Sequence, residues 1–264
     1  MLYPNKKLIA SALAIFAMWC RADGLPLPTV LKNAFDLIPL LYTNGLVADW
    51  RYDDTSVSRF VDTVGGNTMT GAVSVANVAL DASAKVGYLN RGAIALDGSQ
   101  TLYGTAANAY SFMQQTWSLW IKPSSFANQG GQVPCIIYQS DNLGNNEDRL
   151  LLGANAGIGY INYGTAAYQF SLNSPGGVIS SSAWTHVCCT KNLTNAAIYI
   201  NGVQVASSNY TYTARGPCNM PFAIGAYPPR VYPNAGHYSG SIDDLMIYTN
   251  ALSSQQVYRI SHWW

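Results

Sequence analysis

Charge is scarce in this chain of 264 residues. Lysine, arginine, aspartate and glutamate together make up 10% of it, and the formal net charge at pH 7 is +1. In an average soluble domain, roughly a quarter of the residues are charged. A nearly neutral chain has no strong field that would gather nucleic acid or an anionic membrane surface. We therefore expect no nucleic acid among its partners.

Several catalytic signatures are missing too. The chain has no Gly-x-Ser-x-Gly motif, no phosphate-binding loop and no dinucleotide fingerprint. It has only three histidines, His186, His237 and His262. His186 lies in a predicted strand, where we expect a structural role, and His237 lies in a loop, where either a solvated or a ligand-contacting role remains open. These absences argue against an enzyme.

The apolar run near the N-terminus is too short to cross a bilayer comfortably. Residues 8–19 follow Lys6 and Lys7 and precede Ala22, an order typical of a secretory signal peptide. We interpret residues 1–22 as a signal peptide or, alternatively, as a hydrophobic N-terminal anchor. The expected location is secreted or extracellular, and we do not expect an integral membrane protein.

Removal of residues 1–22 would leave four cysteines, Cys135, Cys188, Cys189 and Cys218. Four cysteines allow three pairings, and the sequence does not choose among them. Cys188 and Cys189 are neighbours in a predicted strand, so their side chains point to opposite faces. A bridge from one of them to Cys218 and a set of buried free thiols both remain open. No spacing resembles a zinc site.

Glycine and aromatic residues are abundant, with 23 Gly, 18 Tyr and 7 Trp. This mixture is typical of short strands and tight turns. A hairpin is predicted over residues 197–206, because an Asn-Gly pair separates two runs of strand-forming residues. The turn pairs Ile200 with Val203 and Ile198 with Val205, and it places all four side chains on one buried face.

The remaining pattern predicts about ten strands and few helices. Short strands joined by Gly- and Asn-rich turns favour two packed antiparallel sheets, an all-β sandwich. One short helix is predicted over residues 253–260. The other predicted strands are residues 46–52, 93–96, 117–122, 136–139, 150–153, 157–163, 186–190, 221–225 and 241–248.

Residues 23–44 have a different pattern, that of a linker with a short apolar helix. Pro26 and Pro28 stiffen its start, and Thr29 is suited to cap a helix whose apolar residues form one broad stripe. That stripe either packs on the sandwich or docks onto a partner chain. The predicted organisation is residues 1–22, the linker 23–44, the sandwich 45–260 and a tail 261–264.

Several segments resemble, in order, the laminin G-like branch of the concanavalin A-like lectin and glucanase superfamily. The resemblance extends over residues 45–260 and implies a jelly-roll sandwich used for glycan binding or adhesion. The matching segments are Gly45–Trp50, Ala95–Ser99, Thr116–Lys122, Trp184–Val187, Tyr199–Gly202, Gly240–Tyr248 and Ala251–Ser253.

The superfamily includes glucanases, whose activity requires two carboxylates that flank the scissile bond. This chain has one glutamate, Glu147, and no predicted strand carries aspartates alternating on one face. Asp243 and Asp244 are neighbours and point to opposite faces. We therefore expect no catalytic residues and no hydrolase activity.

The resemblance implies calcium as the candidate cofactor. Asp97, in an Asp-Gly turn, and Asp243, in the closing strand, match family positions that contribute oxygen ligands. The alternative is that these carboxylates cap turns by accepting hydrogen bonds from backbone amides. Residues 141–148 lack the ligand spacing of an EF-hand, and we expect them to form a solvated loop.

The candidate ligand surface is the loop from residue 226 to residue 238. Its prolines stiffen the chain, so aromatic faces would be presented at low ordering entropy. Tyrosine rings suit the apolar faces of sugars, and arginine and asparagine suit their hydroxyls. The alternative is that these tyrosines pack the loop onto the sandwich edge. The candidate residues are Tyr227, Arg230, Tyr232, Asn234, His237 and Tyr238.

Two functions fit these observations. The first is a non-catalytic extracellular binding or adhesion module that recognises a glycan or a surface protein. The second is a structural subunit of an assembly, such as a phage fibre, a capsid decoration or an extracellular filament, in a virion or on a surface. In that case residues 24–44 would hold a partner chain and the sandwich would be displayed.

Overall fold

The structure is a computed structural model. It describes residues 44–53, 60–71, 78–81, 92–107, 112–141, 146–164, 167–181, 183–212, 218, 220–227 and 235–262. The predicted signal peptide or anchor, the apolar helix of the linker and the last two residues of the tail lie outside these ranges.

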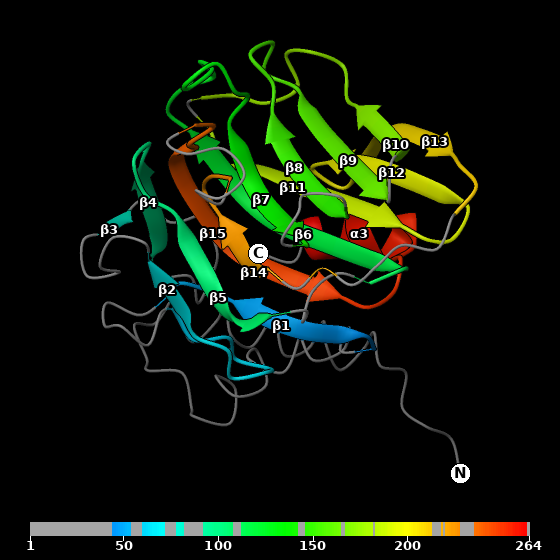
Figure 1. Cartoon of the computed structure of the whole chain (residues 1–264), viewed down its shortest axis with the longest axis horizontal. Helices are drawn as coiled ribbons and strands as arrows, with labels where there is room; N and C mark the ends of the chain where they lie inside the picture. Colours follow the sequence, from blue (N-terminus) through cyan, green and yellow to red (C-terminus); the bar gives the residue numbers. More distant parts are fainter. Residues whose placement is uncertain are drawn as a thin grey trace, which may run out of the picture. The chain divides into compact units, whose positions relative to one another are not determined.

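Fifteen strands in the described ranges form two antiparallel sheets (Figure 1). This confirms the prediction of an all-β sandwich. The eight-stranded sheet runs in the order β13 (Val203–Asn209), β12 (Asn195–Ile200), β11 (Thr185–Lys191), β6 (Gln115–Pro123), β15 (Ser239–Tyr248), β4 (Ala93–Asp97) and β3 (Ala79–Asp81), with β1 (Leu46–Trp50) also paired to β15. The seven-stranded sheet runs in the order β10 (Ala167–Asn173), β9 (Ile158–Gly164), β8 (Glu147–Leu152), β7 (Cys135–Ser140), β14 (Pro221–Ile224), β5 (Leu102–Ala107) and β2 (Met69–Gly71).

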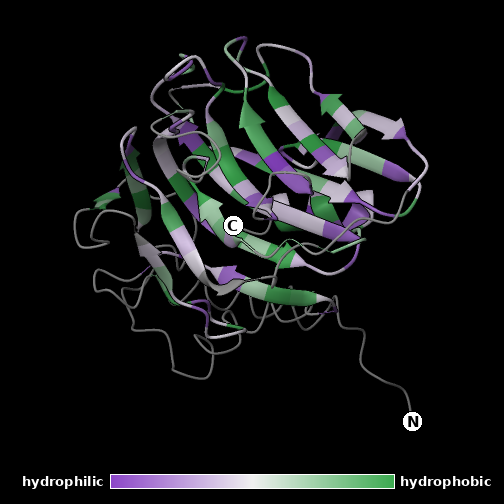
Figure 2. Ribbon diagram, viewed as in Figure 1, coloured by the Kyte–Doolittle hydropathy of each residue, from purple (hydrophilic) through white to green (hydrophobic). Residues whose placement is uncertain are grey.

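The main core lies between the two sheets. Hydrophilic and hydrophobic residues are banded along many strands (Figure 2), and alternate side chains of a strand point to opposite faces. Phe222 stacks on Trp50 with ring centroids 6.2 Å apart and meets the edge of Trp117 at 6.1 Å. All three rings are buried, and burial of a side chain such as Phe222 contributes about 1.5–3 kcal/mol.

The predicted hairpin is present, with a different register. Asn201 and Gly202 have positive φ angles of 49° and 80°, as a tight Asn-Gly turn requires. Ile200 pairs with Val203 as expected, but a bulge shifts Ile198 opposite Ala206. The prediction that all four side chains share one buried face is therefore wrong for Val203. This residue is 60% exposed, on β13 at the edge of its sheet.

The predicted C-terminal helix is confirmed as α3 (Ser254–Ser261). A capping box formed by Ser253 and Gln256 begins it, and satisfies amide groups that the first turn leaves without partners. Val257 and Ile260 are buried in a cluster with outward-facing residues of β11, β12 and β15. Helix α3 therefore covers part of the outer face of the eight-stranded sheet.

A buried ion pair ties the two sheets together. Lys191 on β11 places Nζ 2.7 Å from Oδ1 of Asp148 on β8, with side chains that are 3% and 0% exposed. The amide of Asn162 also donates to Oδ1 of Asp148, at 2.5 Å. Burying an ion pair is favourable only when its geometry is good and other hydrogen bonds support it.

The prediction that residues 141–148 form a solvated loop is therefore wrong at its end. Glu147 and Asp148 begin β8 and are 1% and 0% exposed. Both carboxylates have protein cations as partners, Arg149 for Glu147 and Lys191 for Asp148. Those partners allow the two charges to be buried.

All four described cysteines are free and buried. Cys189 joins the main core and Cys188 joins the cluster under α3, which confirms that they face opposite sides. Cys218 donates its thiol to the carbonyl of Asn146 at 3.2 Å and forms no bridge. Burial raises the pKa of the Cys135 and Cys188 thiols, so neither is readily converted to a reactive thiolate.

Candidate functional site

The outer face of the seven-stranded sheet is the candidate site, because α3 packs on the other sheet. One row of residues crosses all seven strands on this face, since each is the ladder partner of the next. The row is Ser171, Ile161, Arg149, Tyr138, Ala223, Tyr103 and Thr70. Tyr138 and Ala223 in the middle of this row are fully buried, so only the part of the row toward β8, β9 and β10 is open to a ligand.

The centre of this face is built by β8. Asp148 points inward to Lys191, so its neighbours Glu147 and Arg149 point outward. Arg149 forms an ion pair with Oε2 of Glu147, and the Tyr138 hydroxyl donates to Oε1 at 2.7 Å. The side chains of Glu147 and Arg149 are 2% and 17% exposed. The glutamate is thus covered, and the arginine reaches the surface.

Two tyrosines hold the guanidinium of Arg149 in place. Its central carbon lies 5.8 Å from the ring centroid of Tyr138 and 5.6 Å from that of Tyr227. The two rings meet edge to face at 5.4 Å. A cation over aromatic rings gains electrostatic attraction, and this arrangement orders the side chain before any ligand arrives.

Tyr227, a predicted ligand residue, packs onto this face with its own surface largely covered. Its side chain is 3% exposed and belongs to a cluster with Cys135, Tyr138 and Leu151. Gly236 approaches it closely, since an added Cβ there would lie 2.4 Å from Tyr227 Cε2. Tyr227 therefore packs against Tyr138 and Arg149 and does not present an exposed ring to a ligand.

The open part of the face lies over β8, β9 and β10. Tyr163 and Tyr168 are ladder partners, with ring centroids 5.0 Å apart and planes at 78°. Tyr168 is 60% exposed, the highest value among the exposed tyrosines of the described chain. We call these two tyrosines, Arg149, Ile161 and Ser171 the open patch. Sequence reasoning predicted the strand that carries Tyr163 but did not single out either tyrosine.

The other predicted ligand residues are distributed differently. Arg230, Tyr232 and Asn234 lie outside the described residues. Tyr238 is fully buried in the main core, where its hydroxyl donates to the Ser241 carbonyl at 3.0 Å. His237 is half-buried at the sheet margin, bridged through its backbone to Cys135.

The predicted calcium ligands do not meet. Asp97 is the ladder partner of Ser239, and Asp243 lies four residues further along β15. Four residues of strand span about 13 Å, whereas calcium ligands lie about 2.3–2.6 Å from the ion. The two carboxylates therefore do not fit one shared ion. In the described ranges, no group of three His, Cys, Asp or Glu side chains is arranged for a metal.

Each of these aspartates has a structural role instead. Asp97 is exposed and accepts hydrogen bonds from the amide and hydroxyl of Ser99 at 2.8 and 2.7 Å, which lower its pKa. Asp243 is buried and accepts the Asp244 amide at 2.9 Å. The bonds to Asp97 are of the turn-capping kind, whereas Asp243 bonds to the next amide of its own strand, where the register of β15 shifts.

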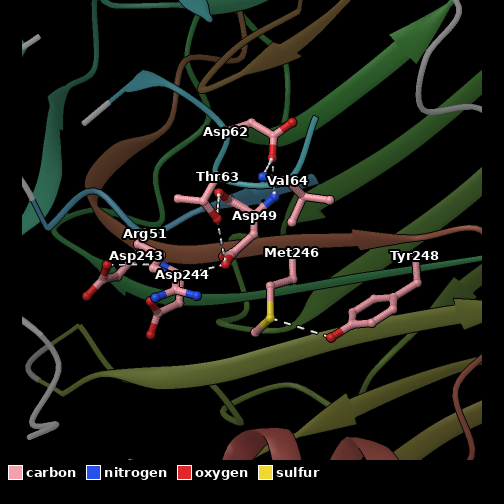
Figure 3. A network of polar contacts seen from close by, with 9 residues as sticks. All are labelled: Asp49, Arg51, Asp62, Thr63, Val64, Asp243, Asp244, Met246 and Tyr248. Atoms are coloured by element: carbon pink, nitrogen blue, oxygen red, sulfur yellow. Dashed lines mark hydrogen bonds and ion pairs between the residues drawn. The ribbon is translucent and has the colours of Figure 1, made fainter. Parts of the chain in front are cut away.

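Figure 3 shows the polar network to which Asp243 and Asp244 belong. Asp49 accepts hydrogen bonds from Arg51 Nε at 2.9 Å and Thr63 Oγ1 at 3.1 Å. Asp62 accepts the backbone amide of Asp49 at 2.8 Å and ties the loop after β1 to that strand. Burial raises the pKa of Asp49, and the nearby Arg51 charge opposes this shift. The network fastens β1 and the loop that follows it.

A family model described as the concanavalin A-like lectin/glucanases superfamily matches residues 95–258. The chain belongs to this superfamily. No curated protein matches it in sequence. The similarity among solved structures is at the level of the superfamily fold, because the sequence identities are low.

Three solved structures of this fold are informative. Domain 4 of AbnA, an extracellular GH43 arabinanase from Geobacillus stearothermophilus solved with arabinotriose, has a TM-score of 0.60 and 21% identity, covering 82% of this chain and 98% of that one. The receptor-binding domain of botulinum neurotoxin type G has a TM-score of 0.59 and 15% identity, covering 83% and 51%. The ligand-binding domain of botulinum neurotoxin serotype D, solved with N-acetylneuraminic acid, has a TM-score of 0.58 and 15% identity, covering 82% and 50%. The present chain thus spans about half the length of these two toxin chains.

No helix in the described ranges has the length and apolar character needed to cross a membrane.

Proposed function

We propose that this protein is a non-catalytic, secreted binding module that recognises a glycan through the open patch. The observation that carries the proposal is the perpendicular pair of the exposed Tyr168 and the half-buried Tyr163 beside the ordered Arg149. Aromatic rings stack on the apolar C–H faces of sugars, and a guanidinium donates to their hydroxyl oxygens. Two structures of the same fold were solved with a sugar, arabinotriose in one and N-acetylneuraminic acid in the other.

The absence of a paired-carboxylate site supports binding without catalysis. Glu147 is the chain's one glutamate, and its carboxylate is already occupied by Arg149 and Tyr138. A retaining or inverting glycosidase needs a second carboxylate across the substrate, and none lies on the seven strands of this sheet facing outward.

A glycan array probed with wild-type protein, Tyr168→Ala and Tyr258→Ala tests this proposal. Tyr258 is a matched control, since it is 51% exposed but lies on α3, away from the open patch. We expect Tyr168→Ala to weaken glycan binding by about tenfold or more, which is about 1.4 kcal/mol. Tyr258→Ala should bind like wild type. Equal binding by all three proteins would refute the site.

A structural subunit remains the second candidate, and the edge strand β13 favours it. This seven-residue strand has no charged residue or proline, the usual guards of an exposed edge. Such an edge could pair with a strand of another chain in a fibre or filament. Sedimentation of the full chain tests this, because a monomer over a wide concentration range argues against assembly through β13.

A further inference from the structure

The charge of the open patch indicates which class of glycan it can select, an inference that rests on the proposed function. Charged residues occur on only one of the seven strands of this sheet, β8. Of the three charged residues on β8, Asp148 points into the core. Glu147 and Arg149 are therefore the charges that the described strands present on the outer face.

These two charges cancel. The Arg149 guanidinium is paired directly with the Glu147 carboxylate, whose other oxygen accepts the Tyr138 hydroxyl. A ligand carboxylate beside a lone cation would gain electrostatic attraction. The adjacent Glu147 charge opposes that gain with a similar magnitude. An acidic sugar therefore gains little over an uncharged one.

The remaining features of the open patch suit hydroxyl groups and apolar sugar faces. An arginine has five N–H donors, and Glu147 occupies only part of that fork; the exposed part of the Arg149 side chain, not its buried Nε, can reach a ligand. A sugar hydroxyl accepts from N–H without carrying charge. Tyr163 and Tyr168 supply ring surface, and the exposed Ser171 supplies a further hydroxyl on the same row.

The ring geometry also limits how a sugar is held. Because the Tyr163 and Tyr168 planes stand at 78°, a sugar stacked on one ring meets the edge of the other. One sugar ring is stacked at a time. We infer that the open patch binds an uncharged glycan through one stacked sugar ring hydrogen-bonded to Arg149, and that Glu147 suppresses selection of acidic sugars.

The test compares a neutral galactoside oligosaccharide with the same oligosaccharide capped by N-acetylneuraminic acid. Titration of the full chain by calorimetry at 50 and 500 mM NaCl should give neutral-glycan affinities within about twofold of each other, since no net charge is screened. The capped glycan should bind no more tightly than the neutral one. Tenfold tighter binding of the capped glycan that is lost at high salt would overturn the inference and leave the proposed function standing.

Glu147→Gln sharpens the test, because it frees the Arg149 charge and keeps the side chain's size. We expect this variant to bind the acidic glycan at least fivefold more tightly than wild type, with a salt dependence that wild type lacks. An unchanged ratio of acidic to neutral affinity in the folded variant would contradict the role given to Glu147. Arg149→Gln is a second variant, expected to weaken neutral-glycan binding severalfold and to leave it insensitive to salt.

The two proposals fail in different ways. Glycan binding that ignores Tyr168→Ala, or binding of no glycan on a broad array, overturns the proposed function. Glycan binding that needs Tyr168 but favours acidic sugars overturns only the inference about charge.

Discussion

Replacing Lys191 with methionine should sharply lower the free energy of unfolding, because it strands a buried carboxylate. Lys191 Nζ lies 2.7 Å from Asp148 Oδ1, where the attraction is about 6 kcal/mol at an effective dielectric constant of about 20. Methionine preserves most of the side chain's volume, so packing changes little. Removing one partner of a buried pair typically costs about 3–5 kcal/mol.

The pH dependence of that loss identifies its cause. The stranded Asp148 can be neutralised by taking up a proton. For a carboxyl of ordinary pKa, protonation at pH 7 costs about 4 kcal/mol, and this cost falls by about 1.4 kcal/mol for each unit by which the pH is lowered. The pKa of this carboxyl is raised in the folded variant, so the variant loses stability as pH rises. The deficit relative to wild type should therefore shrink to about 1–2 kcal/mol at pH 5.

Urea denaturation of wild type, Lys191→Met and the double variant Lys191→Met with Asp148→Leu would measure these values. The double variant has no buried charge at this point and should recover most of the lost stability. The control Lys122→Met removes a less buried ion pair, with Asp81, whose side chains are 23% and 16% exposed, and it should cost clearly less stability than Lys191→Met. The reasoning would be refuted if the free energy of unfolding of Lys191→Met were within about 1 kcal/mol of the wild-type value, or if its deficit were the same at pH 5 and pH 7.

Two other substitutions or titrations follow from local geometry. Gly236→Ala should clearly lower the midpoint of unfolding, because the added Cβ would lie 2.4 Å from Tyr227 and the backbone has a positive φ of 65°. The control Gly66→Ala has a similar φ of 68° but no atom within 4 Å of the added Cβ, so it measures the backbone strain alone and should cost only about 1 kcal/mol. The hydrogen bonds that Asp97 accepts lower its pKa in the folded protein. Its contribution to stability is therefore fully present above pH 3.8 and is lost as the pH falls through the lower pKa of the folded state. A titration by nuclear magnetic resonance that gives a pKa of 3.8 or higher would contradict this.

Local signals in the sequence predicted much of the fold. The Asn201–Gly202 turn and the helix that follows Ser253 depend on residues within a few positions, and both are present where expected. The opposite orientation of Cys188 and Cys189 follows from strand geometry alone. The register beyond the turn was wrong, because a bulge next to Ile198 depends on packing that the local pattern does not reveal.

The candidate site was harder to predict, because its parts come from distant segments. Asp148 is buried through Lys191, 43 residues away in the sequence, so its segment was expected to be a solvated loop. The exposure of Tyr168, and the partial exposure of Tyr163, depends on which sheet α3 covers, and strand periodicity does not report that. The available signal in the sequence was the lone Glu147-x-Arg149 pair, with Tyr163 and Tyr168 on the two strands that follow it.

Hydrogen–deuterium exchange of the full chain, with and without the oligosaccharide that binds most tightly on the array, tests the central claim most directly. We expect slower exchange on binding in β8, β9 and β10, which carry the open patch, and no change in β13 or α3. Protection confined to β13 and α3, or to the turn at Asp97 and Ser99, would contradict the assignment of the binding face.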